Sequence, residues 1–210
     1  MDDDGYADVV ESDEAPDSHG ESFDKRVVWG GPDGSKSVTK LHTDGDSATG
    51  IGDFDGDGAL DLLTVAKPSF TQSADGPQPA TVLYGPLSRD DGVPRTTLTL
   101  DVGYEGWASV KYTAVGDFDV DGNQDILASK QVIVGEAGGD RAVAVYGSSH
   151  GPGRGEDRPG DIGNLKLGLR NVTVCDINGD SYDDIAIQSS NDGPVSQALG
   201  GQDGLSTIDR

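Results

Sequence analysis

An aspartate-rich loop that recurs along the chain constrains the fold more than any other feature of the sequence. The three complete copies read GDFDGDGALDL at 52–62, GDFDVDGNQDI at 116–126 and CDINGDSYDDI at 175–185. We number the loop positions from the first aspartate, so that loop 2 covers residues 53–61, loop 3 covers 117–125 and loop 4 covers 176–184. The first aspartates of successive loops are 64 and 59 residues apart. A repeat at this spacing predicts a fold built from supersecondary units of one kind.

A truncated copy, loop 1, occupies residues 1–8 at the start of the chain. Asp8 falls at position nine, Gly5 at position six and Met1 at the apolar position two, whereas the aspartate of position one would precede Met1. The 53 residues from Asp8 to Asp61 are close to the other intervals. The sequence therefore predicts that the chain is a fragment of a longer exported protein, or the product of a misplaced start.

A second element, an apolar strand that runs into a glycine-rich turn, alternates with the loops. Its copies lie at 27–34, 82–86, 143–151 and 198–205. Short β-type runs flank the loops at 62–65, 112–115, 126–128, 172–174 and 185–187. These runs are too short and too closely bounded by glycine to be helices. We therefore predict an all-β chain that forms a single domain over residues 1–210. Its repeats are expected at about 1–47, 48–111, 112–171 and 172–210.

The charge of the chain excludes some classes of partner. Acidic residues number 38 and basic residues 15, which gives a net charge of −23 at pH 7. This charge argues against nucleic acid and against anionic membranes, because both would repel it. No apolar run approaches the roughly 18 residues of a membrane helix, and the acidic N-terminus does not resemble a signal peptide. We therefore expect no nucleic-acid partner, no membrane insertion and no export signal within this chain.

The loop pattern predicts a site for a hard cation. Carboxylates at positions one, three, five and nine, with the carbonyl of position seven, supply oxygen ligands on the inside of one tight turn. Glycine at position six permits a backbone angle that a side chain would resist. A cation with about six to eight oxygen ligands suits this arrangement, and calcium tolerates irregular geometry better than magnesium does. Cysteine and histidine, which softer metals prefer, do not occur at these positions.

The sequence thus predicts Ca²⁺ as the bound ion. The expected ligands are Asp53, Asp55, Asp57, Ala59 and Asp61 in loop 2; Asp117, Asp119, Asp121, Asn123 and Asp125 in loop 3; Asp176, Asn178, Asp180, Tyr182 and Asp184 in loop 4; and Asp2, Asp4, Tyr6 and Asp8 in loop 1. Loop 1 is expected to bind poorly because its first ligand is missing. Solvated Asp-Gly turns without an ion remain the alternative.

An EF-hand shares the opening of this loop but does not fit the rest of it. That motif needs a bidentate glutamate at position twelve and a helix on either side. Position twelve is held here by Thr64, Ala128 and Ile187, and the flanking runs are predicted strands. The sequence therefore excludes an EF-hand.

The loop motif and the strand-and-turn element at 198–205 resemble the FG-GAP repeats of the integrin α-chain β-propeller and of related bacterial proteins. The resemblance covers nearly the whole chain, and it implies four-stranded blades around an axis, each with a calcium loop on one face. Such propellers usually have about seven blades, whereas this chain holds about three and a half to four, so we expect part of a larger propeller. Two residues depart from the pattern: Val120 replaces glycine at position four, and Ser181 replaces glycine at position six.

The resemblance implies a non-catalytic, calcium-binding module for adhesion or ligand binding, outside the cell or at its surface, with a protein or glycan ligand. The alternatives are a structural or binding portion of a secreted hydrolase whose catalytic residues lie outside this chain, or a nonfunctional fragment. A Gly-x-Ser-x-Gly sequence at 147–151 matches a hydrolase motif, but it coincides with the repeated glycine turn, so we predict no catalytic role for Ser149. Open blade edges also predict self-association.

Overall fold

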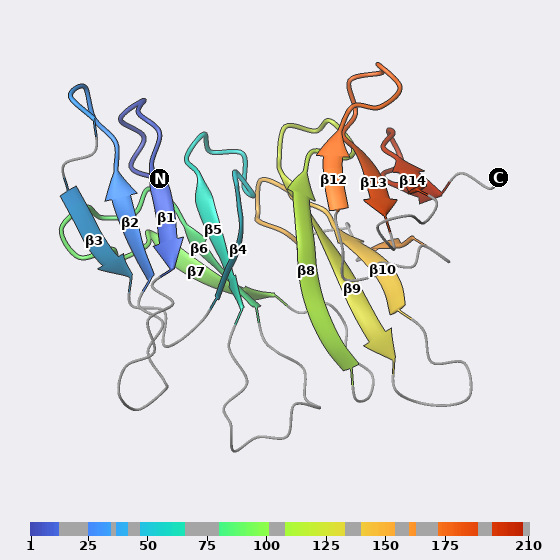
Figure 1. Cartoon of the computed structure of the whole chain (residues 1–210), viewed down its shortest axis with the longest axis horizontal. Coiled ribbons are helices and arrows are strands. Elements are labelled where there is room, and N and C mark those ends of the chain that lie inside the picture. Colours follow the sequence, from blue (N-terminus) through green and yellow to red (C-terminus); the bar gives the residue numbers. More distant parts are fainter. Residues whose placement is uncertain are drawn as a thin grey trace. The chain divides into compact units, whose positions relative to one another are not determined.

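The described part of the chain is entirely β. The computed structural model describes residues 1–12, 25–34, 37–41, 47–65, 80–100, 108–132, 140–153, 160–162, 172–188 and 195–207. These stretches contain strands, turns and bends but no helix, which confirms the all-β prediction (Figure 1). No helix long and apolar enough to cross a membrane therefore occurs among them.

The strands form four separate antiparallel sheets, which divide between two compact units. The first unit contains a three-stranded sheet, with β1 (Val9–Ser12), β2 (Lys25–Trp29) and β3 (Ser37–Leu41), and a four-stranded sheet, with β4 (Ser47–Gly52), β5 (Asp61–Val65), β6 (Ala80–Tyr84) and β7 (Thr96–Leu100). The second unit contains two four-stranded sheets, with β8 (Ala108–Gly116), β9 (Asp125–Val132), β10 (Asp140–Val145) and β11 (Gly160–Asp161), and with β12 (Val172–Cys175), β13 (Asp184–Gln188), β14 (Val195–Leu199) and β15 (Ser206–Thr207). In every sheet the strands pair in chain order.

The strands that the sequence predicted beside the loops and before the glycine turns are all present. The runs beside the loops fall in β5, β8, β9, β12 and β13, and the runs before the turns fall in β2, β6, β10 and β14. Each sheet corresponds to one repeat, although β4 and β8 begin slightly before the boundaries expected at 48 and 112. The sequence pattern therefore located the strands beside the loops and before the glycine turns, but gave no ranges for β1, β3, β4, β7, β11 and β15.

Loops 2, 3 and 4 each connect the first strand of a sheet to the second. Across the hairpin, the residue before position one pairs with position nine: Gly52 with Asp61, Gly116 with Asp125 and Cys175 with Asp184. The second strand is deeply buried, and β5 is buried at every residue, as its nearly continuous apolar sequence predicts. Position nine is therefore an aspartate at the first residue of a buried strand.

Each unit has an apolar cluster that joins its two sheets. In the first unit the cluster consists of Met1, Val27, Trp29, Leu41, Leu62 and Leu87. In the second unit it consists of Phe118, Leu127, Ala142, Ala144, Ile162, Ile185, Ile187 and Ala198. Met1 of loop 1 thus packs in one cluster with residues of the β4–β7 sheet, and Phe118 of loop 3 packs in the other with residues of the β12–β15 sheet, which anchors these two loops.

Candidate metal centre

The four loops share an unusual backbone conformation. Positions four and six both lie in the left-handed region: Asp3, Gly56, Val120 and Gly179 at position four have φ of 61°, 68°, 55° and 83°, and Gly5, Gly58, Gly122 and Ser181 at position six have φ of 83°, 88°, 88° and 77°. The sequence predicted this conformation at position six only. Two left-handed residues within nine curl the loop back on itself, which lets side chains distant in sequence approach one another.

The position-one carboxylate organises each complete loop by accepting backbone hydrogen bonds. In loop 2, Asp57 N–H donates to Asp53 Oδ1 at 3.1 Å and Gly58 N–H donates to Asp53 Oδ2 at 2.8 Å. The same bonds recur in loop 3, from Asp121 and Gly122 to Asp117, and in loop 4, from Asp180 and Ser181 to Asp176. Side chain and backbone therefore hold the loop in shape from within.

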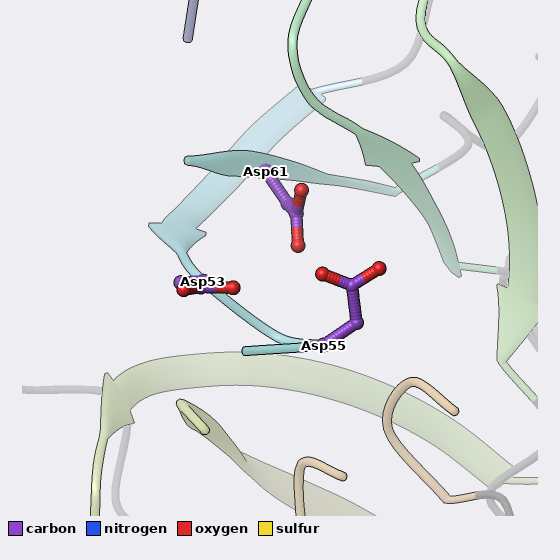
Figure 2. Close-up of side chains that lie close together, drawn as sticks. All are labelled: Asp53, Asp55 and Asp61. Carbon is purple, nitrogen blue, oxygen red and sulfur yellow. The ribbon is translucent and has the colours of Figure 1, made fainter. Parts of the chain in front are cut away.

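Carboxylates at positions one, three and nine converge in loops 2 and 3. One oxygen each from Asp53, Asp55 and Asp61 lies within 4.8 Å of the other two. Figure 2 shows the carboxylates of Asp55 and Asp61 facing one another across the loop, with Asp53 beside them. Asp117, Asp119 and Asp125 form the equivalent group in loop 3. Each group of three could hold a metal ion.

The position-nine carboxylate has a second role, because it binds the glycine turn of its own sheet. Asp61 Oδ1 accepts a hydrogen bond from Gly85 N–H at 2.8 Å, and Asp125 Oδ1 accepts one from Gly147 N–H at 2.8 Å. The other oxygen of Asp125 accepts from Phe118 N–H at 2.8 Å. Loops 1 and 4 repeat the bond to the turn, from Gly30 to Asp8 and from Gly200 to Asp184, both at 2.9 Å. These bonds explain why the loops and the glycine turns alternate in step along the sequence.

Burial and mutual repulsion make loop 3 a strained site without a cation. The Asp125 side chain is fully buried, and burial raises its pKa to about 8, against two backbone hydrogen bonds that lower it. The nearby Asp119 and Asp117 carboxylates raise the pKa of Asp125 further. Burial also raises the pKa of Asp117. A bound cation would relieve both effects, because it favours the ionised carboxylates.

These pKa shifts predict an inverse dependence of stability on pH in metal-free protein. The Asp125 carboxyl keeps its proton up to about pH 8 in the folded state but loses it near pH 4 when unfolded. The folded state therefore binds more protons between these values, so the free energy of unfolding should fall as pH rises from about 4 to about 8. Urea unfolding with chelator at pH 5 and pH 8 measures the change, and Asp125→Asn should flatten it. A metal-free protein that is most stable at pH 8 would contradict this expectation.

Loops 1 and 4 differ from the other two in their charges. In loop 4, position three is Asn178, whose Nδ2 donates to Asp180 Oδ2 at 2.8 Å and whose Oδ1 accepts from Asp180 N–H at 3.0 Å. In loop 1, the Arg89 guanidinium donates to both Asp2 and Asp4 and lies 5.5 Å from the centre of the Trp29 ring. Burial raises the pKa of Asp2, but the hydrogen bond from Arg89 and other favourable contacts outweigh it, so the net pKa is lowered. An arginine thus already balances part of the negative charge of loop 1.

A further set of hydrogen bonds joins the carboxylates of position five to the N–H groups of position seven. Asp57 and Asp121, at position five, lie outside both groups of three. Each position-five carboxylate, including those of Asp4 and Asp180, accepts a hydrogen bond from the N–H of position seven. The donors are Tyr6, Ala59, Asn123 and Tyr182, at 2.8–3.0 Å. Asp57 also accepts a bond from Arg95, an ion pair that no local sequence pattern indicates.

Val120 should destabilise loop 3 through its backbone. A β-branched residue at φ 55° is strained, typically by about 1–2 kcal/mol, and its side chain is half exposed, so it contributes little packing. We expect Val120→Asn to raise the free energy of unfolding by about 1 kcal/mol, because asparagine tolerates this region. Chemical denaturation measures the gain. Val195→Asn, at a similarly exposed residue in a strand, is the control and should give no gain.

The loops are identified as candidate metal sites from the geometry and the chemistry of their side chains. The converging positions one, three and nine are among the five that the repeat indicated, whereas the glycine-turn donors and the two arginines come from distant parts of the sequence. Within the described residues, the loops at 53–61 and 117–125 are the ones whose carboxylates gather in threes. A scan of the chain against protein-family models found no match, and a search of curated proteins found no significant match.

Proposed function

We propose that the chain is a non-catalytic, calcium-binding module of the FG-GAP β-propeller type, which serves adhesion or ligand binding outside the cell. The observation that carries the proposal is the convergence of three carboxylates in each of two loops. In support, a copy of the loop precedes β1 in the first sheet and connects the first two strands in each of the other three, and those three sheets have the four strands expected of a propeller blade.

The chemistry of the groups favours calcium over other metals. All three side chains in each group are carboxylates, which are hard oxygen donors and suit calcium, magnesium or manganese. The loop supplies one buried and two half-buried carboxylates from a curled, irregular backbone rather than a regular octahedron. Calcium accepts such geometry and about six to eight oxygens, whereas magnesium demands near-ideal octahedral coordination.

Calcium would act here as a structural ion. Two carboxylates about 4–5 Å apart repel by about 3–4 kcal/mol at an effective dielectric constant of about 20, before salt screening reduces the figure. A divalent cation replaces that repulsion by attraction and links the loop to the first residue of a buried strand. A rigid set of loops of this kind would present a stable surface to a protein or glycan ligand. The net charge of −23 fits a soluble module that takes up cations.

Thermal unfolding with and without calcium tests the proposal. We expect the midpoint to rise when calcium is added to metal-free protein, because each occupied site contributes about 2.7 kcal/mol at a hundredfold excess over its dissociation constant. Asp119→Asn should lose about half of the gain, because it disables one of two groups. Asp203→Asn removes the same charge at an exposed turn outside the loops and should keep the full gain. If neither calcium nor chelator changed the unfolding midpoint, the proposal that the loops bind calcium would be wrong.

A further inference from the structure

Neighbouring sheets in this chain are joined by one repeated junction. In the first unit, the position-two residue Met1 packs with Leu62, and its carbonyl accepts a hydrogen bond from Leu87 N–H at 2.7 Å. In the second unit, Phe118 packs with Ile185, and its carbonyl accepts a bond from Gly201 N–H at 3.0 Å. Each junction thus combines an apolar side chain from one loop with a backbone donor from the next glycine turn.

In both junctions the position-two side chain packs near an equivalent pair of strand residues, which we call the receiving pair. Leu62 and Leu83 are cross-strand partners in β5 and β6, and Ile185 and Ala198 are cross-strand partners in β13 and β14. Leu62 and Ile185, both at position ten of the repeat, are fully buried. Of their partners, Ala198 is also fully buried and Leu83 is half-buried.

The backbone N–H that donates to the position-two carbonyl lies at an equivalent place in both glycine turns. Gly201 directly follows Gly200, the residue that binds the position-nine aspartate. Pro86 holds that place after Gly85 and has no N–H, so the next residue, Leu87, donates instead. A junction therefore needs an N–H one or two residues after the glycine that binds position nine.

Among the described residues, the two surfaces that form this junction are exposed at loop 4 and at the β1–β3 sheet. Ile177, the position-two residue of loop 4, is 39% exposed, whereas Met1 is 5% and Phe118 is 0% exposed. Val9, the position-ten residue of β1, is 53% exposed, and its cross-strand partner is Val28 in β2. Gly31 follows Gly30, which binds Asp8, so it stands where Gly201 stands in the last sheet.

We propose that a second copy of this chain covers these surfaces, seating its Ile177 on the Val9–Val28 pair and directing the Ile177 carbonyl at Gly31 N–H. A second copy is the occupant because this chain bears both complementary halves of a junction that it already forms within itself. The two halves differ, so the contact is heterologous and runs head to tail. It uses a sheet face and a loop, not the strand edges that the sequence indicated.

Sedimentation equilibrium at moderate salt, with calcium present, tests this proposal on the full chain. Salt is needed because two chains of net charge −23 repel one another. We expect particles of at least about twice the chain mass of 21.7 kDa for the unmodified protein. Ile177→Asp and Val9→Asp should each sediment as monomers, because each places a charge in the apolar contact. Val93→Asp, at a loop residue between β6 and β7 that is 53% exposed and belongs to neither surface, should associate like the unmodified protein.

A mixture of the two monomeric variants identifies the contact. Ile177→Asp keeps an intact Val9 surface and Val9→Asp keeps an intact Ile177, so an equimolar mixture should form a heterodimer that cannot grow further. Both substituted residues are exposed, and unchanged melting of each variant shows that it still folds. Three results would overturn the proposal: a monomeric unmodified chain, association that neither substitution weakens, or a mixture that stays monomeric.

Discussion

Replacing Asp125 by alanine should lower the free energy of unfolding by about 3 kcal/mol even without calcium, because two buried N–H groups lose their acceptor. The Asp125 side chain is fully buried and accepts bonds from Gly147 N–H and Phe118 N–H, both at 2.8 Å. Each unsatisfied buried donor costs about 1–3 kcal/mol, and the relief of an unfavourable buried carboxyl offsets part of the sum. Urea unfolding in the presence of chelator measures this structural contribution.

Asparagine at the same position separates the structural role from the metal site. Asp125→Asn keeps one oxygen acceptor and the shape of the protonated acid, so the metal-free protein should lose less stability than the alanine variant. With calcium, however, it should lose the gain from loop 3, because it removes a carboxylate from the group of three. If alanine and asparagine were equally stable in chelator, the two hydrogen bonds would not be the cause of the loss.

Replacing Gly200 by alanine should be nearly as damaging, by about 3 kcal/mol, for a steric reason. A Cβ atom at residue 200 would lie 2.5 Å from the Asp183 carbonyl oxygen and 2.7 Å from the Phe118 carbonyl oxygen. Both contacts are with backbone, so a rotamer change cannot relieve them. The turn would have to move away from Asp184, which would break the bond from Gly200 N–H. The midpoint of denaturant unfolding measures the loss.

The neighbouring glycine is a matched control for this substitution. A Cβ atom at Gly201 would have its nearest contact at 3.9 Å, from the Gly204 carbonyl oxygen, and the residue does not have a positive φ. Gly201→Ala keeps the N–H that bonds Phe118 and should change stability by less than about 0.5 kcal/mol. Similar losses for the two variants would mean that the effect of Gly200→Ala does not come from the close approach of the backbone at residue 200.

The same close approach recurs in every sheet, which accounts for the glycine turn as a repeated element. A Cβ at Gly30, Gly85, Gly147 or Gly200 would in each case meet the carbonyl oxygen of loop position eight at 2.4–2.6 Å. The loop and the turn therefore fit together as backbone against backbone, with the position-nine aspartate as the hydrogen-bonding link. The two elements are two halves of one contact.

Local patterns in the sequence were sufficient to locate the strands beside the loops and before the glycine turns, and to indicate the carboxylates that converge. Apolar runs bounded by glycine predicted β2, β5, β6, β9 and β13 because alternation and turn chemistry act over a few residues. Aspartates at fixed spacing indicated positions one, three and nine because the loop closes on itself within nine residues. Position four is also left-handed in all four loops. It is glycine only in loops 2 and 4, as Gly56 and Gly179, so the sequence did not indicate this conformation for Asp3 and Val120.

The sequence by itself determined that the chain is β, that it repeats, and where its acidic loops lie, since these properties depend on neighbouring residues. Only the tertiary structure decided which carboxylate is buried, which arginine pairs with loop 1, and which position-two residue is exposed. Asp125 is buried and accepts a hydrogen bond from a turn 22 residues away, whereas Ile177 is exposed although it holds the same loop position as the buried Phe118. Such contacts join distant parts of the chain, so burial and pKa depend on packing that no local pattern encodes.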